Sequence, residues 1–317
     1  MAQSAAAKNR RRRKKRRSQA PVALIYFLTL LIFLAVFGLF AKYLMDRLNN
    51  KTEEEIDYSE TYIDSYNTLY ARVNSKNVLS DLFLMRICPE QGKILFIPMS
   101  AFTVSSSDGS TFRQVYADGG IRKLKESVDD TLGISTDYYC TLSNQSFEDV
   151  IDIIGGFLYA PEEELYHLSA DDGNDISLRA NKAVTLSGKQ VRLLCQTNIF
   201  SKGRQGNTEF LGQALVGVCN NAFDQVEITT NSLDIIYSKV SSSSSTNITE
   251  NDFKQHKTYI KEMLKKQLQP AYSMVPEGQW ASNGNSFTIS PEFKQKVYDE
   301  MEATKSSQKS GVITKDE

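Results

Sequence analysis

The chain has 317 residues, 41% of them hydrophobic, and its charges nearly cancel, with 37 Lys and Arg against 38 Asp and Glu. Nine of these cations lie in one run over residues 8–17, and their removal leaves 28 Lys and Arg against 38 Asp and Glu. The remainder is therefore acidic, which argues against nonspecific nucleic-acid binding and requires that any phosphate site be a local cluster of Arg and Lys.

An uncharged apolar stretch over 22–41 follows the basic run. About 20 such residues in a helix span a hydrocarbon core of ~30 Å, and Lys and Arg beside a first helix keep that flank in the cytoplasm. The sequence thus predicts a basic cytoplasmic tail over 1–20, a transmembrane helix over 21–43 and an extracytoplasmic stalk over 44–66. A cleaved signal peptide is the alternative, but its apolar region is shorter and ends at a small-residue cleavage site that is absent here.

The protein is therefore predicted to lie in the cell membrane, single-pass, with its N-terminus cytoplasmic and its C-terminal part extracytoplasmic. A run of Lys and Arg can also bind nucleic acid or anionic lipid. Because this run lies beside an apolar span, membrane topology explains it better, and the membrane rather than nucleic acid is the predicted partner.

Beyond the stalk, short apolar runs alternate with turn residues. Strands are predicted over 68–73, 82–88 and 93–98, and the Pro-Glu-Gln-Gly sequence at 89–92 indicates a hairpin turn between the last two. A helix is predicted from 121 to Gly133, because apolar residues recur there at helical spacing.

The next predicted elements continue the alternation: a strand over 138–142, a helix over 146–154, a strand over 191–196 and an amphipathic helix over 208–220.

A Ser-rich loop over 238–248 precedes a last long helix, for which Thr249 is the predicted cap. The polar end over 303–317 is predicted to be disordered. Strands alternating with helices are typical of layered α/β proteins. We therefore predict, over 67–302, a three-layer α/β/α domain with a central, mostly buried mixed sheet.

The four cysteines sit in apolar runs without CxxC spacing, which disfavours zinc and redox motifs; they are Cys88, Cys140, Cys195 and Cys219. Buried thiols, or one or two disulfides in an oxidising exterior, both stay open. With only two histidines in the chain, a Ser-His-Asp hydrolase or a His-rich metal site is disfavoured.

Seven segments carry a family resemblance: SDLFLMRICPEQGKILFIP (80–98), QVYADGG (114–120), LGISTDYYCTLSNQSFEDVIDIIGGF (132–157), LSGKQVRLLCQ (186–196), GRQGNTEFLGQAL (203–215), TNITENDF (246–253) and MVPEGQW (274–280). In this order and spacing the chain resembles the LytR-CpsA-Psr (LCP) family, bacterial envelope proteins with a basic tail, one transmembrane helix and an exported α/β/α domain. No single segment is specific, and their order carries the resemblance.

The resemblance implies a phosphotransferase that moves a glycopolymer from polyprenyl pyrophosphate to a peptidoglycan hydroxyl. In such a site arginines grip pyrophosphate oxygens and carboxylates hold Mg²⁺, so that both stabilise charge on the leaving group. The lipid tail requires an apolar slot between sheet and helices.

The charged residues of that site are partly replaced in this sequence. The family's Ser-Asp-Thr reads Ser80-Asp81-Leu82, with Leu79 where an Arg is usual. Its Ile-Pro-Arg-Asp-Thr reads Ile-Pro-Met-Ser-Ala over 97–101, which removes an Arg and an Asp.

Further along the chain, Gln196 stands where an Arg is expected, and the Gly-Arg-x-x-Arg-Gln pattern keeps only Gly203-Arg204. Arg113 stands at an Asn position, so the resemblance assigns it no role. Since losing one arginine contact to a transferring phosphate costs orders of magnitude in rate, we expect phosphotransfer to be weak or lost while the fold is retained.

The residual site candidates are Asp81 and Arg204 as catalytic residues, Asp81 as a ligand for Mg²⁺, and Arg113 and Lys202 as phosphate or lipid-binding residues. Two of them have a structural alternative, because Asp81 can bond a turn and Arg204 can cap a helix or pair at the surface. Gly119-Gly120 fits a phosphate cradle or, better, a tight turn. An apolar stripe fits core packing better than a lipid slot; it comprises Phe210, Leu211, Leu215 and Val218.

Three functions follow from these residues. The first is a pseudoenzyme of cell-wall assembly that binds polyprenyl-linked or wall glycans such as peptidoglycan and partners an active LCP paralogue. The second is an active phosphotransferase with substitute residues, which requires Arg113 and Arg204 to converge. The third is a membrane-tethered sensor or scaffold.

Overall fold

The computed structural model describes residues 65–169, 174–241, 245–266 and 269–305. The predicted cytoplasmic tail and transmembrane helix lie outside these residues, as do nearly all of the stalk and of the C-terminal tail. Within the described ranges, no helix is long and apolar enough to cross a membrane.

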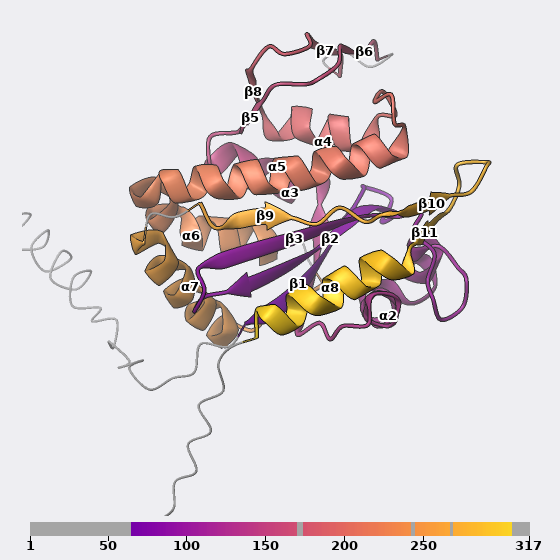
Figure 1. Ribbon diagram of the computed structural model, residues 1–317. Helices are drawn as coiled ribbons and strands as arrows, with labels where there is room; N and C mark the ends of the chain where they lie inside the picture. Colours follow the sequence, from indigo (N-terminus) through magenta and orange to yellow (C-terminus); the bar gives the residue numbers. More distant parts are fainter. Residues whose placement is uncertain (1–64, 170–173, 242–244, 267–268, 306–317) are drawn as a thin grey trace, which may run out of the picture. The chain divides into compact units, whose positions relative to one another are not determined.

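A mixed five-stranded sheet forms the centre of the domain (Figure 1), in the order β4 (Tyr138–Ser143), β1 (Tyr66–Val73), β2 (Leu79–Cys88), β3 (Lys93–Ser100) and β9 (Ala271–Ser273). β1, β2 and β3 form an antiparallel meander, and β4 and β9 pair parallel at the two edges. The central strands are apolar on both faces, as a sheet covered on both sides requires. The predicted strands over 68–73, 82–88, 93–98 and 138–142 are confirmed.

The hairpin between β2 and β3 turns where the sequence indicates. The amide of Gly92 donates to the carbonyl of Pro89 at 3.2 Å, and Gly92 has a φ of 64°. That positive φ suits glycine, which lacks the Cβ that would clash there.

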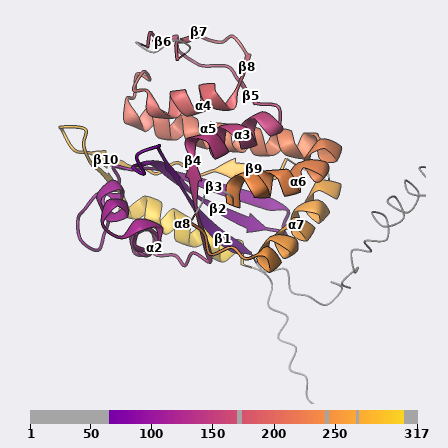
Figure 2. The ribbon, with the colours of Figure 1, turned by 180° about the vertical axis from the view of Figure 1, so that it is seen from behind.

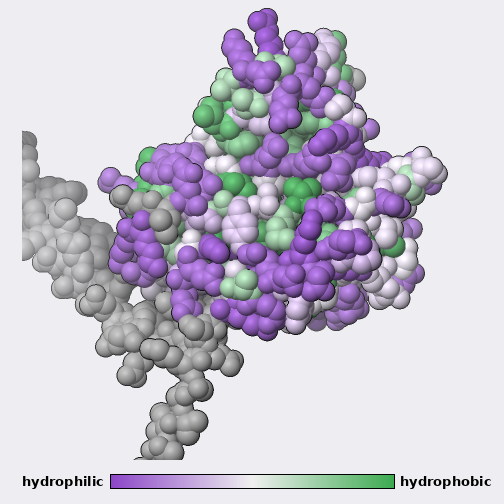
Figure 3. Space-filling model, in the orientation of Figure 1, coloured by the Kyte–Doolittle hydropathy of each residue, from purple (hydrophilic) through white to green (hydrophobic). Residues whose placement is uncertain are grey.

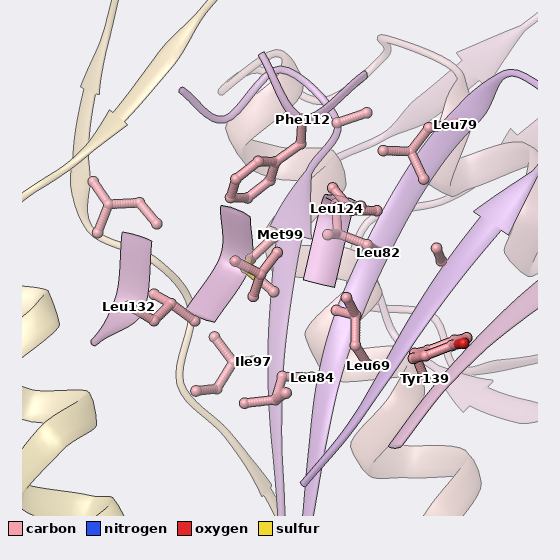
Figure 4. Packing of buried hydrophobic residues seen from close by; sticks show 14 of the residues in the cluster. Leu69, Leu79, Leu82, Leu84, Ile97, Met99, Phe112, Leu124, Leu132 and Tyr139 are labelled. Atoms are coloured by element: carbon pink, nitrogen blue, oxygen red, sulfur yellow. The ribbon is translucent and has the colours of Figure 1, made fainter. Parts of the chain in front are cut away.

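One face of the sheet is covered by α2 (Phe112–Leu132) and α8 (Pro291–Ala303). Their apolar side chains, with Val297 on α8 among them, join those of the strands in one buried cluster. Figure 4 shows part of this cluster, including Leu69, Leu84, Ile97 and Leu124. Gly133 ends α2 in the left-handed conformation, as predicted, and Gly120 interrupts the helix with a φ of 65°. The Gly119-Gly120 pair therefore makes a kink inside α2.

The opposite face is covered by α3 (Asn144–Ile153), α5 (Arg204–Asp224), α6 (Val226–Ser241) and α7 (Glu250–Lys265), as Figure 2 shows from behind. Thr249 caps α7 in a reciprocal pair of bonds with Asp252, which confirms the predicted cap. Helices thus lie on both faces of the sheet. α6 continues through Ser241, so the first residues of the predicted 238–248 loop are helical.

A second apolar cluster packs α3, α4 (Gly188–Gln196) and α5 against two ribbons, β5 (Phe157–Tyr159) with β8 (Val184–Leu186), and β6 (Leu165–His167) with β7 (Ile176–Leu178). A further ribbon pairs β10 (Gly278–Trp280) with β11 (Phe287–Ile289).

The strand predicted over 191–196 is wrong, since these residues belong to helix α4. Ser187 and Gln190 form a capping box at its start, and Val191, Leu194 and Cys195 are buried together on one side. A six-residue apolar run is too short for its periodicity to distinguish a buried strand from a buried helix. The capping box of Ser187 and Gln190 is the sequence signal that identifies the helix.

Within the described residues no disulfide joins the four cysteines. Burial raises the pKa of the Cys195 thiol, and it raises that of Cys219 to about 12. These thiols therefore behave as small apolar groups rather than as nucleophiles.

Candidate functional site

An apolar cavity of about 320 Å³ lies between the sheet and the helices α3, α5, α6 and α7. Tyr70 and Phe83 line it from the strands, and Leu215 and Val218 line it from α5. The predicted apolar stripe on this helix is thus divided, because its other two members, Phe210 and Leu211, lie in the core. Figure 3 shows that hydrophilic residues cover most of the face viewed in Figure 1, with hydrophobic residues in small separate groups.

Beside this cavity, β1 and β2 carry a buried ion pair. Tyr70 pairs with Phe83 across β1 and β2, and two residues further along, roughly 7 Å, Arg72 pairs with Asp81. Arg72 is 0% exposed and Asp81 is 8% exposed. The Arg72 Nε donates to Asp81 Oδ1 at 2.9 Å, and its Nη2 donates to Oδ2, so both carboxylate oxygens are engaged.

Neighbouring groups fix this guanidinium further. Its Nη1 donates to Asn144 Oδ1 at 2.9 Å, and its Cζ lies 5.1 Å from the centre of the Phe147 ring, which lines the cavity. Burial lowers the pKa of Arg72, but the acidic groups around it, Asp81 first among them, together more than offset this and raise the pKa above its ordinary value. The arginine therefore stays charged in a fully buried position.

Asp81 does not fit the predicted Mg²⁺ site. Mg²⁺ takes carboxylate oxygens in an octahedral shell, whereas both oxygens of Asp81 accept bonds from Arg72. Among the described residues no group of three or more His, Cys, Asp and Glu side chains could hold a metal ion. The groups around Asp81 are therefore those of an ion pair and not those of a metal site.

A second cationic group lies where β3 ends and α2 and α5 begin. The Cζ of Arg113 is 4.4 Å from the centre of the Phe102 ring, and the Cζ of Arg204 is 3.7 Å from it. The Nε of Arg113 also donates to the carbonyl of Leu79 at 3.0 Å, two residues before Asp81. The two arginines predicted as site residues, 91 positions apart in the sequence, are thus brought together.

These two guanidinium groups have no carboxylate partner among the described residues. Arg204 donates from Nη1 to the carbonyl of Gly284 at 2.9 Å. Burial, and then the charge of Arg204, lower the pKa of Arg113. Two like charges held on one aromatic ring form a group that an anion would stabilise.

Lys202 is engaged elsewhere. Its Nζ donates to Glu209 at 2.8 Å, and this ion pair raises the pKa of the exposed lysine. Gln196, at an expected Arg position, donates to Ser80 Oγ at 3.4 Å and so lies beside Asp81.

The replaced positions at the end of β3 face opposite sides of the sheet. Ser100 pairs with Asp81 and shares its face. Met99 is 0% exposed in the apolar cluster beneath α2 (Figure 4). Only the position of the missing Asp, and not that of the missing Arg, therefore belongs to the cavity side.

A wider hollow of about 800 Å³, lined by both polar and apolar side chains, lies along another side of α5. Gln205, Gln213 and Trp280 are among its lining residues, and the Trp280 indole donates to Gln205 Oε1 at 3.2 Å. Amide and aromatic side chains of this kind suit hydroxyl-rich ligands.

Sequence reasoning missed Arg72. A single charge in the buried strand sequence YNTLYARV, facing an Asp in the next strand, was the available signal, because a fully buried arginine is rare unless it is paired.

Comparisons with known proteins give one family and one fold. The model of the LytR_cpsA_psr family matches residues 98–303, more than half of the chain. No match is found among curated proteins.

Several solved structures share the fold. A protein from Eubacterium siraeum DSM 15702, described as a transcription regulator, matches with a TM-score of 0.66 at 12% identity over 76% of this chain and 92% of that chain. B. subtilis TagV matches with a TM-score of 0.61 at 17% identity, over 76% and 96%. TagT, solved bound to LIIa-WTA, matches with a TM-score of 0.57 at 14% identity, over 76% and 91%. At these identities the likeness shows the fold alone.

Proposed function

The chain belongs to the LytR-CpsA-Psr family, and on that premise we propose that it is a membrane-anchored, extracytoplasmic protein of cell-wall assembly that binds polyprenyl-linked or wall glycans without transferring them. One observation carries the proposal. The Arg72–Asp81 pair follows the cavity-lining pair Tyr70 and Phe83 along the sheet, and Arg72 contacts the cavity-lining Phe147; we call this position the cavity end. Arg113 and Arg204 contact the Phe102 ring, and Arg113 also bonds to the carbonyl of Leu79, two residues before Asp81 in β2.

That arrangement suits a ligand with an apolar tail and a phosphate head. An isoprenoid chain fits a cavity lined almost wholly by apolar side chains, and its phosphate would receive forked bonds from two arginines that lack carboxylate partners. TagT has been solved bound to LIIa-WTA, which supports a lipid-linked wall glycan as the ligand class. The wider hollow along α5, with its amide and aromatic side chains, would take the sugars.

The charges at the cavity end support the absence of transfer. Phosphoryl transfer requires positive groups that neutralise the developing charge. Here Asp81 is neutralised by Arg72, and the facing Ser100 and the nearby Gln196 are uncharged. A phosphate at this end would therefore be held and would not be activated.

The apolar stretch over 22–41 supports the membrane anchor. Anchored outside the membrane, the domain would meet lipid-linked polymers where they are presented. Handing such a ligand to an active paralogue, with peptidoglycan as the acceptor, is the partnership we propose.

Native mass spectrometry of the full chain with detergent-solubilised polyprenyl phosphate tests binding, with an active family member as the positive control. We expect an adduct, weakened at least tenfold in an Arg113→Met, Arg204→Met double variant. A transfer assay with the same donor and peptidoglycan should give no product. Failure to form any adduct under conditions where the active relative binds would overturn the proposal.

The convergence of Arg113 and Arg204 favours a second candidate, an active phosphotransferase that uses them as substitutes. Product in the transfer assay that disappears in the double variant would establish it. A tethered sensor or scaffold has no observation of its own in the structure, and cross-linking that recovers a signalling partner and no glycan would favour it.

A further inference from the structure

The carboxylate that resembles the family's metal ligand already has a cation beside it. Both oxygens of Asp81 accept bonds from Arg72, in the parallel fork that arginine forms with carboxylates. A divalent ion that bound Asp81 would have to displace a guanidinium that is 0% exposed and is also held by Asn144 and Phe147.

We infer that Arg72 takes the place of a divalent cation at this site, so that phosphate-bearing ligands bind without Mg²⁺. This rests on the proposed function for the ligand and on the geometry of the ion pair for the metal. Arg72 is a positioning residue, because it acts through Asp81.

The electrostatic reason is direct. An unpaired carboxylate at the cavity end would repel a phosphate held by Arg113 and Arg204, and a divalent ion between them would remove that repulsion. Here Arg72 neutralises Asp81 permanently, from inside the sheet. The other charge near Arg72, Glu148, is paired with Arg192 and so adds little.

A fixed arginine differs from a bound ion in a measurable way. Mg²⁺ can be removed by a chelator, whereas Arg72 cannot. Ligand capture should therefore be the same in EDTA and in MgCl₂, and the free protein should not be stabilised by Mg²⁺.

The test measures the melting temperature of the full-length protein in detergent against MgCl₂ up to about 10 mM, with NaCl matched for ionic strength. For the wild type we expect no shift. Arg72→Met exposes Asp81 to solvent ions, and we expect its melting temperature to rise by about 3 °C with Mg²⁺. The matched control, Arg72→Met with Asp81→Asn, carries neither charge and should not respond.

Two results would overturn the inference. One is a Mg²⁺ response in the wild type that is lost in the Arg72→Met, Asp81→Asn variant, a comparison that holds even where Arg72→Met alone does not fold. The other is a folded Arg72→Met protein without any Mg²⁺ response, which would make Arg72 a structural ion pair only.

Native mass spectrometry with polyprenyl phosphate separates this inference from the proposed function. Capture in MgCl₂ that is lost in EDTA would overturn the inference and leave the proposed function standing. No capture in either condition would overturn the proposed function, and the melting experiment would still decide the role of Arg72.

Discussion

Replacing Arg113 by Met should weaken anion binding while leaving the fold almost unaffected. The Cζ atoms of Arg113 and Arg204 lie 4.4 and 3.7 Å from one ring centre, so they are separated by at most about 8 Å. At that distance two unit charges repel by about 0.5–2 kcal/mol for effective dielectric constants between water and a protein surface. Removing one charge relieves this repulsion in the free protein.

The gain is offset by what Arg113 contributes. Its bond to the Leu79 carbonyl stabilises the fold by about 1–2 kcal/mol, and its contact with Phe102 by about 0.5–1 kcal/mol. The free energy of unfolding should therefore fall by no more than about 2.5 kcal/mol. Affinity for pyrophosphate should fall by about 10- to 100-fold, because a charge-assisted contact is lost.

Isothermal titration with inorganic pyrophosphate at low salt, together with urea unfolding, measures both effects. Arg122→Met is the matched control, since this exposed arginine lies on the same helix and, among the described residues, donates to the Tyr139 hydroxyl and to no carboxylate. Affinity equal to that of the wild type would refute an anion site at Phe102. A loss of more than about 4 kcal/mol of stability would show that Arg113 is mainly structural.

Three further predictions concern stability and are checked by urea unfolding. Arg86, buried beneath α8, donates to the hydroxyl and carbonyl of Thr304, and Arg86→Met should cost about 3–5 kcal/mol; a loss under about 1 kcal/mol would contradict this. Burial lowers the pKa of His256 from 6.5 to about 4, so its neutral form stabilises the fold fully above about pH 6.5 and progressively less down to about pH 4. As the pH falls from about 6.5 to about 4, the free energy of unfolding of His256→Phe should decrease by about 2 kcal/mol less than that of the wild type. Parallel plots of this free energy against pH for the two proteins would refute the assignment. A Cβ at Gly188 would lie 2.2 Å from the Glu148 carbonyl oxygen, so Gly188→Ala should cost about 1–3 kcal/mol, and an unchanged midpoint would show that α3 and α4 can separate.

Much of the fold was predictable because its signals are local. The β2–β3 hairpin has a Pro-Glu-Gln-Gly turn, α7 has its Thr249 cap, and α2 ends at Gly133. Each signal depends on residues within a few positions of one another, which a sequence displays directly. Helix α4 was missed because its short apolar run reads equally well as a strand, and its cap lies four residues before the predicted start.

The site was less predictable because its contacts join distant segments. Asp81 was identified, but its partner Arg72 is chosen by the register of β1 against β2, with an irregularity directly after Arg72. A shift by one residue would place Arg72 on the opposite face. The meeting of Arg113 and Arg204 on Phe102 depends likewise on how α2 and α5 approach the end of β3.

The structure also changes which lost charges matter. The family's Arg and Asp at the end of β3 are both replaced, yet the side chain of Met99 packs in the core on the α2 face. Restoring an arginine there would bury an unpaired charge, at a cost of several kcal/mol, without adding a positive group to the cavity side. On that side the row of Arg72, Asp81 and Ser100 carries no net charge. Arg113 and Arg204, which have no carboxylate partner among the described residues, are therefore the groups on which the proposed phosphate binding depends.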